Sequence, residues 1–144
     1  MRISEVLRIK GGQVVTVTPT VDVGHLLNVL AEHRIGAVVV SADGNSVDGI
    51  VSERDIVRAL ADRGPTVITE PVTAIYTAEV YTVDLDAQVE DLMRIMTQRR
   101  VRHLPVVSSG EMKGIVSIGD VVKWRIDELE SERSALANYI SGSR

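Results

Sequence analysis

The 144-residue sequence has no cysteine, no phenylalanine and few aromatic residues of any kind. The lack of cysteine excludes disulfides, thiolate zinc sites and cysteine nucleophiles. Because aromatic residues make up only 3% of the chain, a folded core must be built from Val, Ile, Leu, Ala and Met. The sequence also has no run of 18 apolar residues, and its start, MRISEVLRIKGG, lacks an apolar stretch of signal-peptide length. We therefore expect a soluble, cytoplasmic protein with no membrane partner.

The common catalytic signatures are missing as well. The sequence contains no G-x-x-x-x-G-K-[ST] phosphate loop, no G-x-G-x-x-G, no H-E-x-x-H and no G-x-S-x-G. Its three histidines are not spaced as metal ligands on one element. With 16 basic against 20 acidic residues, the net charge of -4 argues against a general nucleic-acid binder. We expect a protein that is not an enzyme and holds no metal.

What the sequence does contain is a duplication. Residues 16–40, TVTPTVDVGHLLNVLAEHRIGAVVV, match residues 82–106, TVDLDAQVEDLMRIMTQRRVRHLPV, with a shift of 66 residues. Four apolar positions with the spacing of one amphipathic helix face coincide: Val23, Leu26, Leu27 and Leu30 fall on Val89, Leu92, Met93 and Met96. After a loop shortened by one residue, GIVSERD at 49–55 aligns with GIVSIGD at 114–120. The chain is therefore expected to consist of two copies of one small unit.

Each copy predicts the order strand, helix, strand, strand, helix, preceded by a short helix at residues 3–7 or 72–76. The expected strands are residues 14–17, 37–40 and 48–52 in the first copy, and residues 80–83, 104–107 and 113–117 in the second. The turn formers SADGNS and SSGE predict a hairpin between the last two strands of each copy. A unit of about sixty residues buries too little surface to be stable alone. We expect an α+β fold in which two β-α-β-β-α repeats pack about a pseudo-two-fold axis.

The expected boundaries follow from this alignment and from the composition of the connecting segment. The first repeat spans residues 1–62, a linker with two of the four prolines spans 63–71, and the second repeat spans 72–126. Residues 127–144 form a C-terminal helical extension. An apolar stripe marks this helix at Val122, Ile126, Leu129, Leu136 and Ile140. The stripe favours either packing onto the same module or dimerisation, and the sequence leaves both open.

The motif Ser-x-x-Asp, found once in each copy, has two interpretations. Ser52 or Ser117 can be the N-cap of a helix, with Asp55 or Asp120 closing a capping box. A helix start also presents free N–H groups and the positive end of the helix dipole, which suit a phosphate. A carboxylate one turn along can accept both hydroxyls of a ribose. The two roles are compatible, since Asp is shorter than the usual capping Glu and is expected to face outward.

The two copies resemble CBS domains, the tandem modules named after cystathionine β-synthase. The signature of that family is Gly, two apolar residues, Ser or Thr, two free positions and Asp. The resemblance runs through RIGAVVVSADGNSVDGIVSERDIVRAL and RVRHLPVVSSGEMKGIVSIGDVVKW, up to about Trp124. It implies a compact pair that commonly dimerises into flat discs. It also implies adenosine-containing ligands, AMP, ADP or ATP, or NAD(H) or S-adenosylmethionine, bound in clefts between the repeats.

By this resemblance the two aspartates would hold ribose hydroxyls, and the two serines would lie near phosphate. Residues 35–38 and 101–105 would line the adenine pockets, and a threonine at the end of each preceding strand would close the site. The nucleotide-binding residues implied in this way are Thr16, Ile35, Gly36, Ala37, Val38, Ser52, Arg54, Asp55, Thr82, Val101, Arg102, His103, Leu104, Pro105, Ser117 and Asp120.

The two expected clefts differ in charge. The aligned pairs that differ are Gly36 with Arg102, Ala37 with His103 and Arg54 with Gly119. Arg offers a fork of donors to phosphate oxygens, and His adds a charge that depends on pH. We predict that Arg54, Arg102 and His103 determine how many phosphates each site accepts. An alternative for His103 is a partly buried histidine with a satisfied hydrogen bond.

The function expected from these features is a non-catalytic sensor, a stand-alone CBS pair that forms a homodimer and signals by a change in packing of its repeats. An unidentified enzyme or transporter would be its regulated partner. One alternative is a structural or interaction protein whose clefts stay empty and whose Ser-x-x-Asp motifs are only caps. The other is nucleic-acid binding through Arg94, Arg99, Arg100 and Arg102, for which a solvated helix end is the competing interpretation of Arg99 and Arg100.

Overall fold

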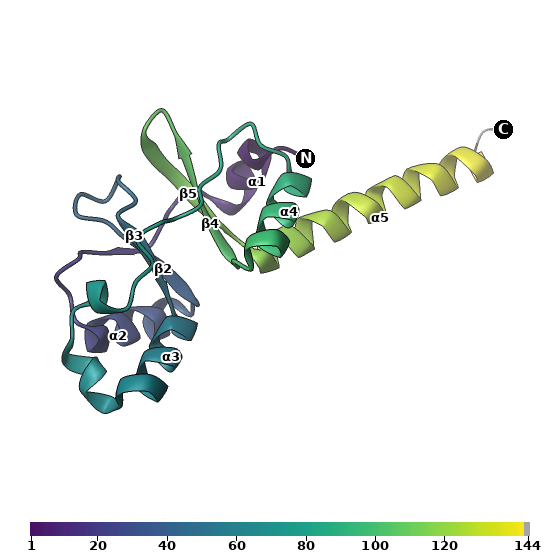
Figure 1. Ribbon diagram of the computed structural model, residues 1–144. Coiled ribbons are helices and arrows are strands. Elements are labelled where there is room, and N and C mark those ends of the chain that lie inside the picture. Colours follow the sequence, from purple (N-terminus) through teal and green to yellow (C-terminus); the bar gives the residue numbers. More distant parts are fainter. Residues whose placement is uncertain (143–144) are drawn as a thin grey trace.

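Each copy of the duplicated unit forms one lobe of the computed structural model, which describes residues 1–142, and a long C-terminal helix projects from the second lobe (Figure 1). The last two residues of the predicted extension, 143–144, lie outside the described residues. Both lobes combine a small sheet with helices packed on it, and they pack about an approximate two-fold axis. The α+β class and the two-repeat architecture predicted from the sequence are confirmed.

The first lobe is built on a three-stranded sheet of order β1-β2-β3, with β1 parallel and β3 antiparallel to the central strand. Its elements are β1 (Thr16–Val17), α2 (Val23–His33), β2 (Ala37–Val40), β3 (Gly49–Ser52) and α3 (Glu53–Arg63), followed by two 3-10 helices, η1 (Pro65–Thr69) and η2 (Val72–Ala74). Helix α2 buries Val23, Leu26 and Leu30 of the predicted apolar face, whereas Leu27, which was also expected on it, is 37% exposed.

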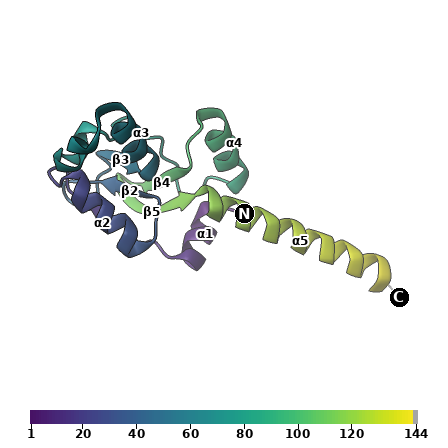
Figure 2. The ribbon, with the colours of Figure 1, turned by 90° about the horizontal axis from the view of Figure 1, so that it is seen from below.

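The second lobe holds a two-stranded antiparallel hairpin, its helices and the N-terminal helix of the chain. Its elements are α1 (Ile3–Lys10), α4 (Val89–Arg99), β4 (His103–Ser108), β5 (Glu111–Ser117) and α5 (Ile118–Gly142). Helix α4 buries Val89, Leu92 and Met96, which correspond to the buried residues of α2, and Met93, like Leu27, is 37% exposed. Figure 2 shows the C-terminal turns of α5 extending away from the lobe, whereas Arg125 near its start pairs with Glu90 of α4.

The short segments that precede the two copies each pack on the other lobe. Ile3, Val6 and Leu7 of α1 belong to the core of the second lobe, together with Leu92 and Val116. Val67 and Val72, from η1 and η2, belong to the core of the first lobe. This exchange ties the lobes together, because neither core is complete without the segment that precedes the other repeat.

The strand expected at residues 80–83 does not form, and this expectation was wrong. Only Val83 bridges to β4, with its N–H donating to the Pro105 carbonyl and its carbonyl accepting from Val107. Extending the ladder toward Tyr81 would require an N–H at residue 105, which proline lacks. In the first lobe the matching residue is Val39, whose N–H does donate, to the carbonyl of Val15.

Two further local predictions needed correction. The strand expected at residues 14–17 is limited to Thr16–Val17. The helix expected at residues 72–76 is a 3-10 turn, Val72–Ala74, that follows Pro71. The remaining strands and both helix starts after the Ser-x-x-Asp serines lie within a few residues of their predicted positions.

Candidate functional site

The Ser-x-x-Asp motif of the first lobe forms a reciprocal cap at the start of α3. The Ser52 hydroxyl accepts from the Asp55 N–H at 3.3 Å, and Oδ2 of Asp55 accepts from the Ser52 N–H at 2.8 Å and from its hydroxyl at 3.0 Å. The capping interpretation of the motif is therefore correct. All of these bonds to Asp55 use Oδ2, and within residues 1–142 no bond engages Oδ1. One oxygen of the carboxylate thus remains available beyond the cap.

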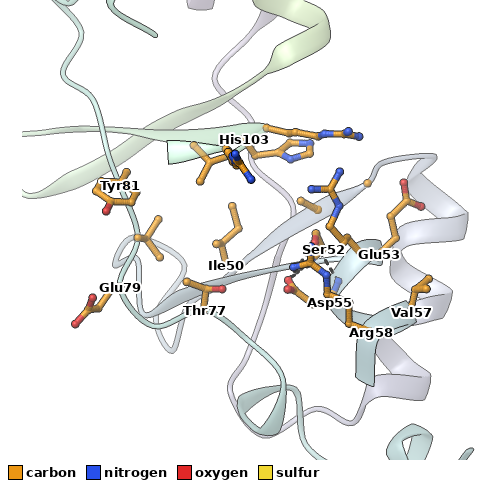
Figure 3. A pocket seen from close by; sticks show the side chains of 17 residues that line it. Ile50, Ser52, Glu53, Asp55, Val57, Arg58, Thr77, Glu79, Tyr81 and His103 are labelled. Atoms are coloured by element: carbon orange, nitrogen blue, oxygen red, sulfur yellow. Dashed lines mark hydrogen bonds between the residues drawn. The ribbon is translucent and has the colours of Figure 1, made fainter. Parts of the chain in front are cut away.

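A cavity of about 590 Å³ opens beside this cap, between the two lobes (Figure 3). Its floor comes from the end of β3 and the first turns of α3, and its opposite wall comes from the start of β4, where His103 lies. The segment that connects the lobes closes one side with Thr77, Glu79 and Tyr81. Both repeats therefore contribute to one cavity, of a size that accommodates a small molecule.

The charged lining of the cavity is dominated by arginine. Arg54 and Arg58 project from α3, and Arg100 and Arg102 lie where α4 ends and β4 begins. Three carboxylates share the lining: Glu53, Asp55 and Glu79. Four guanidinium groups against three carboxylates leave an excess of positive charge beside apolar walls. Such a cavity favours a ligand that carries both an apolar ring and an anionic group.

Eight of the residues expected at the nucleotide sites lie around this cavity: Gly36, Ala37, Ser52, Arg54, Asp55, Val101, Arg102 and His103. Ile35 lines a smaller cavity, of about 440 Å³, beside Gly36 and Glu53. Val38 and Leu104 are buried in the cores of the two lobes, because alternate residues of a strand face opposite sides. Thr16, Thr82, Pro105, Ser117 and Asp120 are not part of the lining of either cavity.

Sequence reasoning missed several residues of the cavity. Ile50, Val57 and Arg58 surround the first motif, and a signal for them existed, since each lies within six residues of Ser52. Thr77, Glu79 and Tyr81 come from a segment assigned to the start of the second repeat, and only the three-dimensional fold brings them to the first motif. Tyr81 also stacks beneath Arg99, whose Cζ lies 5.0 Å from the ring centroid.

The four arginines that suggested a nucleic-acid surface have different surroundings in the structure. Arg100 and Arg102 line the cavity, and Arg99 covers Tyr81. Arg94 lies 3.6 Å from Asp91 on the same helix. The four side chains therefore do not serve one common basic face.

The second Ser-x-x-Asp motif has the same cap but a different neighbour. Asp120 accepts from the Ser117 N–H at 2.9 Å and its own N–H donates to the Ser117 hydroxyl at 3.1 Å. In addition, Lys10 donates to Oδ2 of Asp120 at 2.5 Å. Burial raises the pKa of Asp120, but the bonds from Lys10 and Ser117 outweigh burial and hold the pKa below its usual value.

His103 lies between the two motifs and responds to charges from both. Burial is the largest effect and lowers its pKa, and the positive charges of Lys10 and Arg102 lower it further. The carboxylates of Asp120 and Glu53 act in the opposite direction without reversing the shift. At neutral pH the imidazole is therefore uncharged, and it gains a proton more readily if an anion enters the cavity.

The fold and the cavity define a class of protein: a tandem pair of α+β modules that enclose a ligand-sized cleft at their seam. A family model described as CBS domain matches residues 3–62 and again residues 72–127. The chain belongs to the CBS-domain family, and the resemblance noted from its sequence is confirmed. Among the described residues, no helix is both long and apolar enough to cross a membrane.

Solved structures of similar proteins share this architecture. The CBS-domain protein ATU1752 from Agrobacterium tumefaciens is 44% identical, with a TM-score of 0.84 over 87% of this chain and 99% of that one. The CBS domain protein PAE2072 from Pyrobaculum aerophilum, solved as a complex with AMP, is 31% identical, with a TM-score of 0.74 over 83% and 89% of the two chains. The CBS domain pair of protein MJ0100, in complex with 5'-methylthioadenosine and S-adenosyl-L-methionine, is 20% identical, with a TM-score of 0.77 over 89% and 98%, and shares the fold.

Proposed function

We propose that the protein is a non-catalytic regulatory module that binds an adenosine nucleotide in the cavity between its lobes. The observation that carries the proposal is the position of Asp55. Its carboxylate lies at the edge of a cavity lined by both repeats, with Oδ1 unused by the cap and arginines on two sides. The bound AMP of the similar protein PAE2072 supports an adenosine ligand for a CBS pair.

In this proposal each part of the lining has a separate task. Asp55 accepts hydrogen bonds from the ribose hydroxyls through the oxygen that the cap leaves free. Ile50 and Val101 give the adenine ring apolar contact. Arg54 and Arg102 donate to phosphate oxygens in the bidentate geometry that guanidinium groups favour. The excess of arginine in the lining favours AMP, ADP or ATP over the cationic S-adenosylmethionine, and NAD(H) would need room beyond the phosphates.

The signalling step follows from the origin of the lining. Because the cavity takes residues from both lobes, a ligand there contacts both and favours the arrangement in which those contacts are made. The ligand changes the population of lobe arrangements only by the difference in its affinity for them. A regulated enzyme or transporter would detect that change. Localisation in the cytoplasm accords with an intracellular nucleotide as ligand.

The partner we propose for α5 is a second copy of this chain. Ile126, Leu129, Leu136 and Ile140 are 49%, 46%, 61% and 69% exposed along one side of the helix. With Arg133 they keep the alternating three- and four-residue spacing of a helix–helix seam. The seam is short and is interrupted by Arg133, so it is too weak for a free-standing coiled coil. It suits two modules that also contact each other elsewhere.

Isothermal titration calorimetry with AMP, ADP, ATP, NAD, NADH and S-adenosylmethionine tests the ligand proposal. We expect binding of at least one phosphate-bearing adenosine ligand, abolished by Asp55→Ala. Asp62→Ala, which removes the same charge from an exposed position on the same helix, should bind like the wild type. Ligand at about a hundred times its Kd should stabilise the fold by about 2.7 kcal/mol. Failure of all six ligands to bind would reject the proposal in favour of an interaction protein with empty clefts.

A further inference from the structure

The internal repeat places Lys10 and Glu79 at corresponding points of the two lobes. Each motif begins with a glycine that packs against a side chain from the segment preceding the other repeat. Tyr76 packs on Gly49, and Leu7 packs on Gly114. A Cβ at Gly114 would come within 2.7 Å of Leu7, and one at Gly49 would overlap the ring of Tyr76. Leu7 and Tyr76 are therefore equivalent anchors.

Three residues beyond each anchor the two lobes carry opposite charges, Lys10 in one and Glu79 in the other. Glu79 lines the open cavity on the same side as Thr77 and Tyr81 (Figure 3). Lys10 instead reaches the second motif, where its Nζ donates to Asp120 and, at 2.6 Å, to the carbonyl of Ile115.

The residues that surround Lys10 hold it in that position. Gly11, with φ at 98°, ends α1, and its N–H donates to the Leu7 carbonyl at 2.7 Å. A Cβ on Gly12 would lie 2.6 Å from the Lys113 carbonyl oxygen, so the chain passes directly over β5. The sequence Lys-Gly-Gly thus lays the segment against the second motif. The Lys10 side chain is 29% exposed and that of Asp120 is 24% exposed, so the ion pair is partly shielded from water.

In the first lobe, the groups that correspond to the two Lys10 acceptors have different surroundings. The carbonyl of Ile50, which corresponds to that of Ile115, accepts from the backbone N–H of Thr77 at 2.9 Å. Asp55, which corresponds to Asp120, has no lysine or arginine within ion-pair distance in residues 1–142. A cavity is therefore open beside Asp55, whereas an ammonium group occupies the equivalent place beside Asp120.

We propose that Lys10 acts as a built-in occupant of the position beside Asp120 that corresponds to the open cavity beside Asp55, so that each chain binds a single ligand, beside Asp55. This inference rests on the proposed function, because it takes the two aspartates as alternative ribose acceptors. The Lys10 ammonium offers Asp120 the positive charge and hydrogen bond that compete with a ribose hydroxyl. A ligand would have to break both Lys10 bonds to reach the carboxylate.

The test counts binding sites with adenosine, whose ribose both aspartates would recognise and which needs no arginine. Calorimetry is run on the wild type, on Lys10→Met and on Arg8→Met, the last removing an exposed charge from the same helix. We expect one adenosine per chain for the wild type and Arg8→Met, and two for Lys10→Met. The added site should disappear in Lys10→Met/Asp120→Asn and persist in Lys10→Met/Asp55→Asn. Two sites in the wild type, or one site in a Lys10→Met variant with a normal melting curve, would overturn the inference.

A second measurement needs no ligand and separates this inference from the proposed function. The Asp120 carboxyl is titrated by NMR, and its pKa should rise in Lys10→Met relative to both the wild type and Arg8→Met. An unchanged Asp120 pKa would overturn the role of Lys10, even if the chain binds one nucleotide. No adenosine or AMP binding by any variant would overturn the proposed function and, with it, the closing of a ligand cleft by Lys10.

Discussion

Asp55→Asn separates the cap that the structure shows for this carboxylate from its proposed role as a ribose acceptor. As a cap, Asp55 accepts from the Ser52 N–H at 2.8 Å, and the carbonyl oxygen of Asn can accept the same bond. The same oxygen can also accept the bond from the Ser52 hydroxyl, so the substitution loses only the charge at the helix start. We expect the free energy of unfolding to fall by about 1 kcal/mol.

As a ribose acceptor, the same side chain should matter much more. Hydrogen bonds to a charged group contribute about 1.5–3 kcal/mol, and the amide of Asn presents a donor where the ribose hydroxyl also donates. We therefore expect AMP binding to weaken by about 2–3 kcal/mol, which is about 30- to 150-fold in Kd.

Calorimetry with AMP and urea unfolding measure the two effects on the same samples. Asp120→Asn is the matched control, because it alters the corresponding cap without touching the open cavity. It should leave the AMP Kd of the wild type unchanged. If Asp55→Asn loses stability as expected yet binds AMP within twofold of the wild type, the carboxylate is only a cap and the ribose assignment is refuted.

Three other predictions follow from the structure. Burial holds the pKa of His103 below its ordinary value of about 6.5, so the unfolded chain takes up the proton first and stability falls as the pH drops below about 6.5. The AMP affinity of the wild type should rise relative to that of His103→Asn over the same range, because the phosphate loses charge near pH 6 equally in both. Urea unfolding and calorimetry measure the two effects, and the fall in stability should be smaller in His103→Asn. Gly49→Ala places a methyl group in the ring of Tyr76 and should cost about 1–3 kcal/mol in urea unfolding, whereas Gly119→Ala, with only the Ser117 hydroxyl 3.6 Å away, should be neutral or stabilising; equal effects would contradict the packing argument. Leu129→Asp should convert a dimer into monomers in light scattering, and a wild type that is already monomeric would rule out the α5 contact.

The sequence was sufficient to predict features that depend on local pattern. The apolar faces of α2 and α4 follow from helical spacing, and the starts of α3 and α5 follow from the Ser-x-x-Asp caps. The strand at residues 80–83 is missing because Pro105 cannot donate a hydrogen bond to it. This proline is visible in the sequence, but its effect can be predicted only when β4 is known to be the neighbouring strand.

The different surroundings of Asp55 and Asp120 could be found only from the tertiary fold. Nothing in the local pattern indicates that α1, which begins the chain, completes the core of the second lobe. Because of that exchange, Lys10 meets Asp120 across 110 residues of sequence. Alignment of the repeats compares residues that correspond, whereas Lys10 and Asp120 come from non-corresponding segments, and so their contact lies beyond any argument from periodicity.

The duplication keeps the two caps alike and lets the surrounding side chains differ, and in the proposed function this difference has a consequence for signalling. Both lobes keep the Ser-x-x-Asp cap, because each needs it to begin a helix. The cap thus keeps a carboxylate at this position in both lobes, whether or not a ligand uses it. Selectivity then depends on residues outside the cap, with Arg54 and Arg102 beside one carboxylate and Lys10 beside the other. In the proposed mechanism, a single ligand beside Asp55 contacts both lobes, and the occupied pair then presents a different surface to a partner than the empty one.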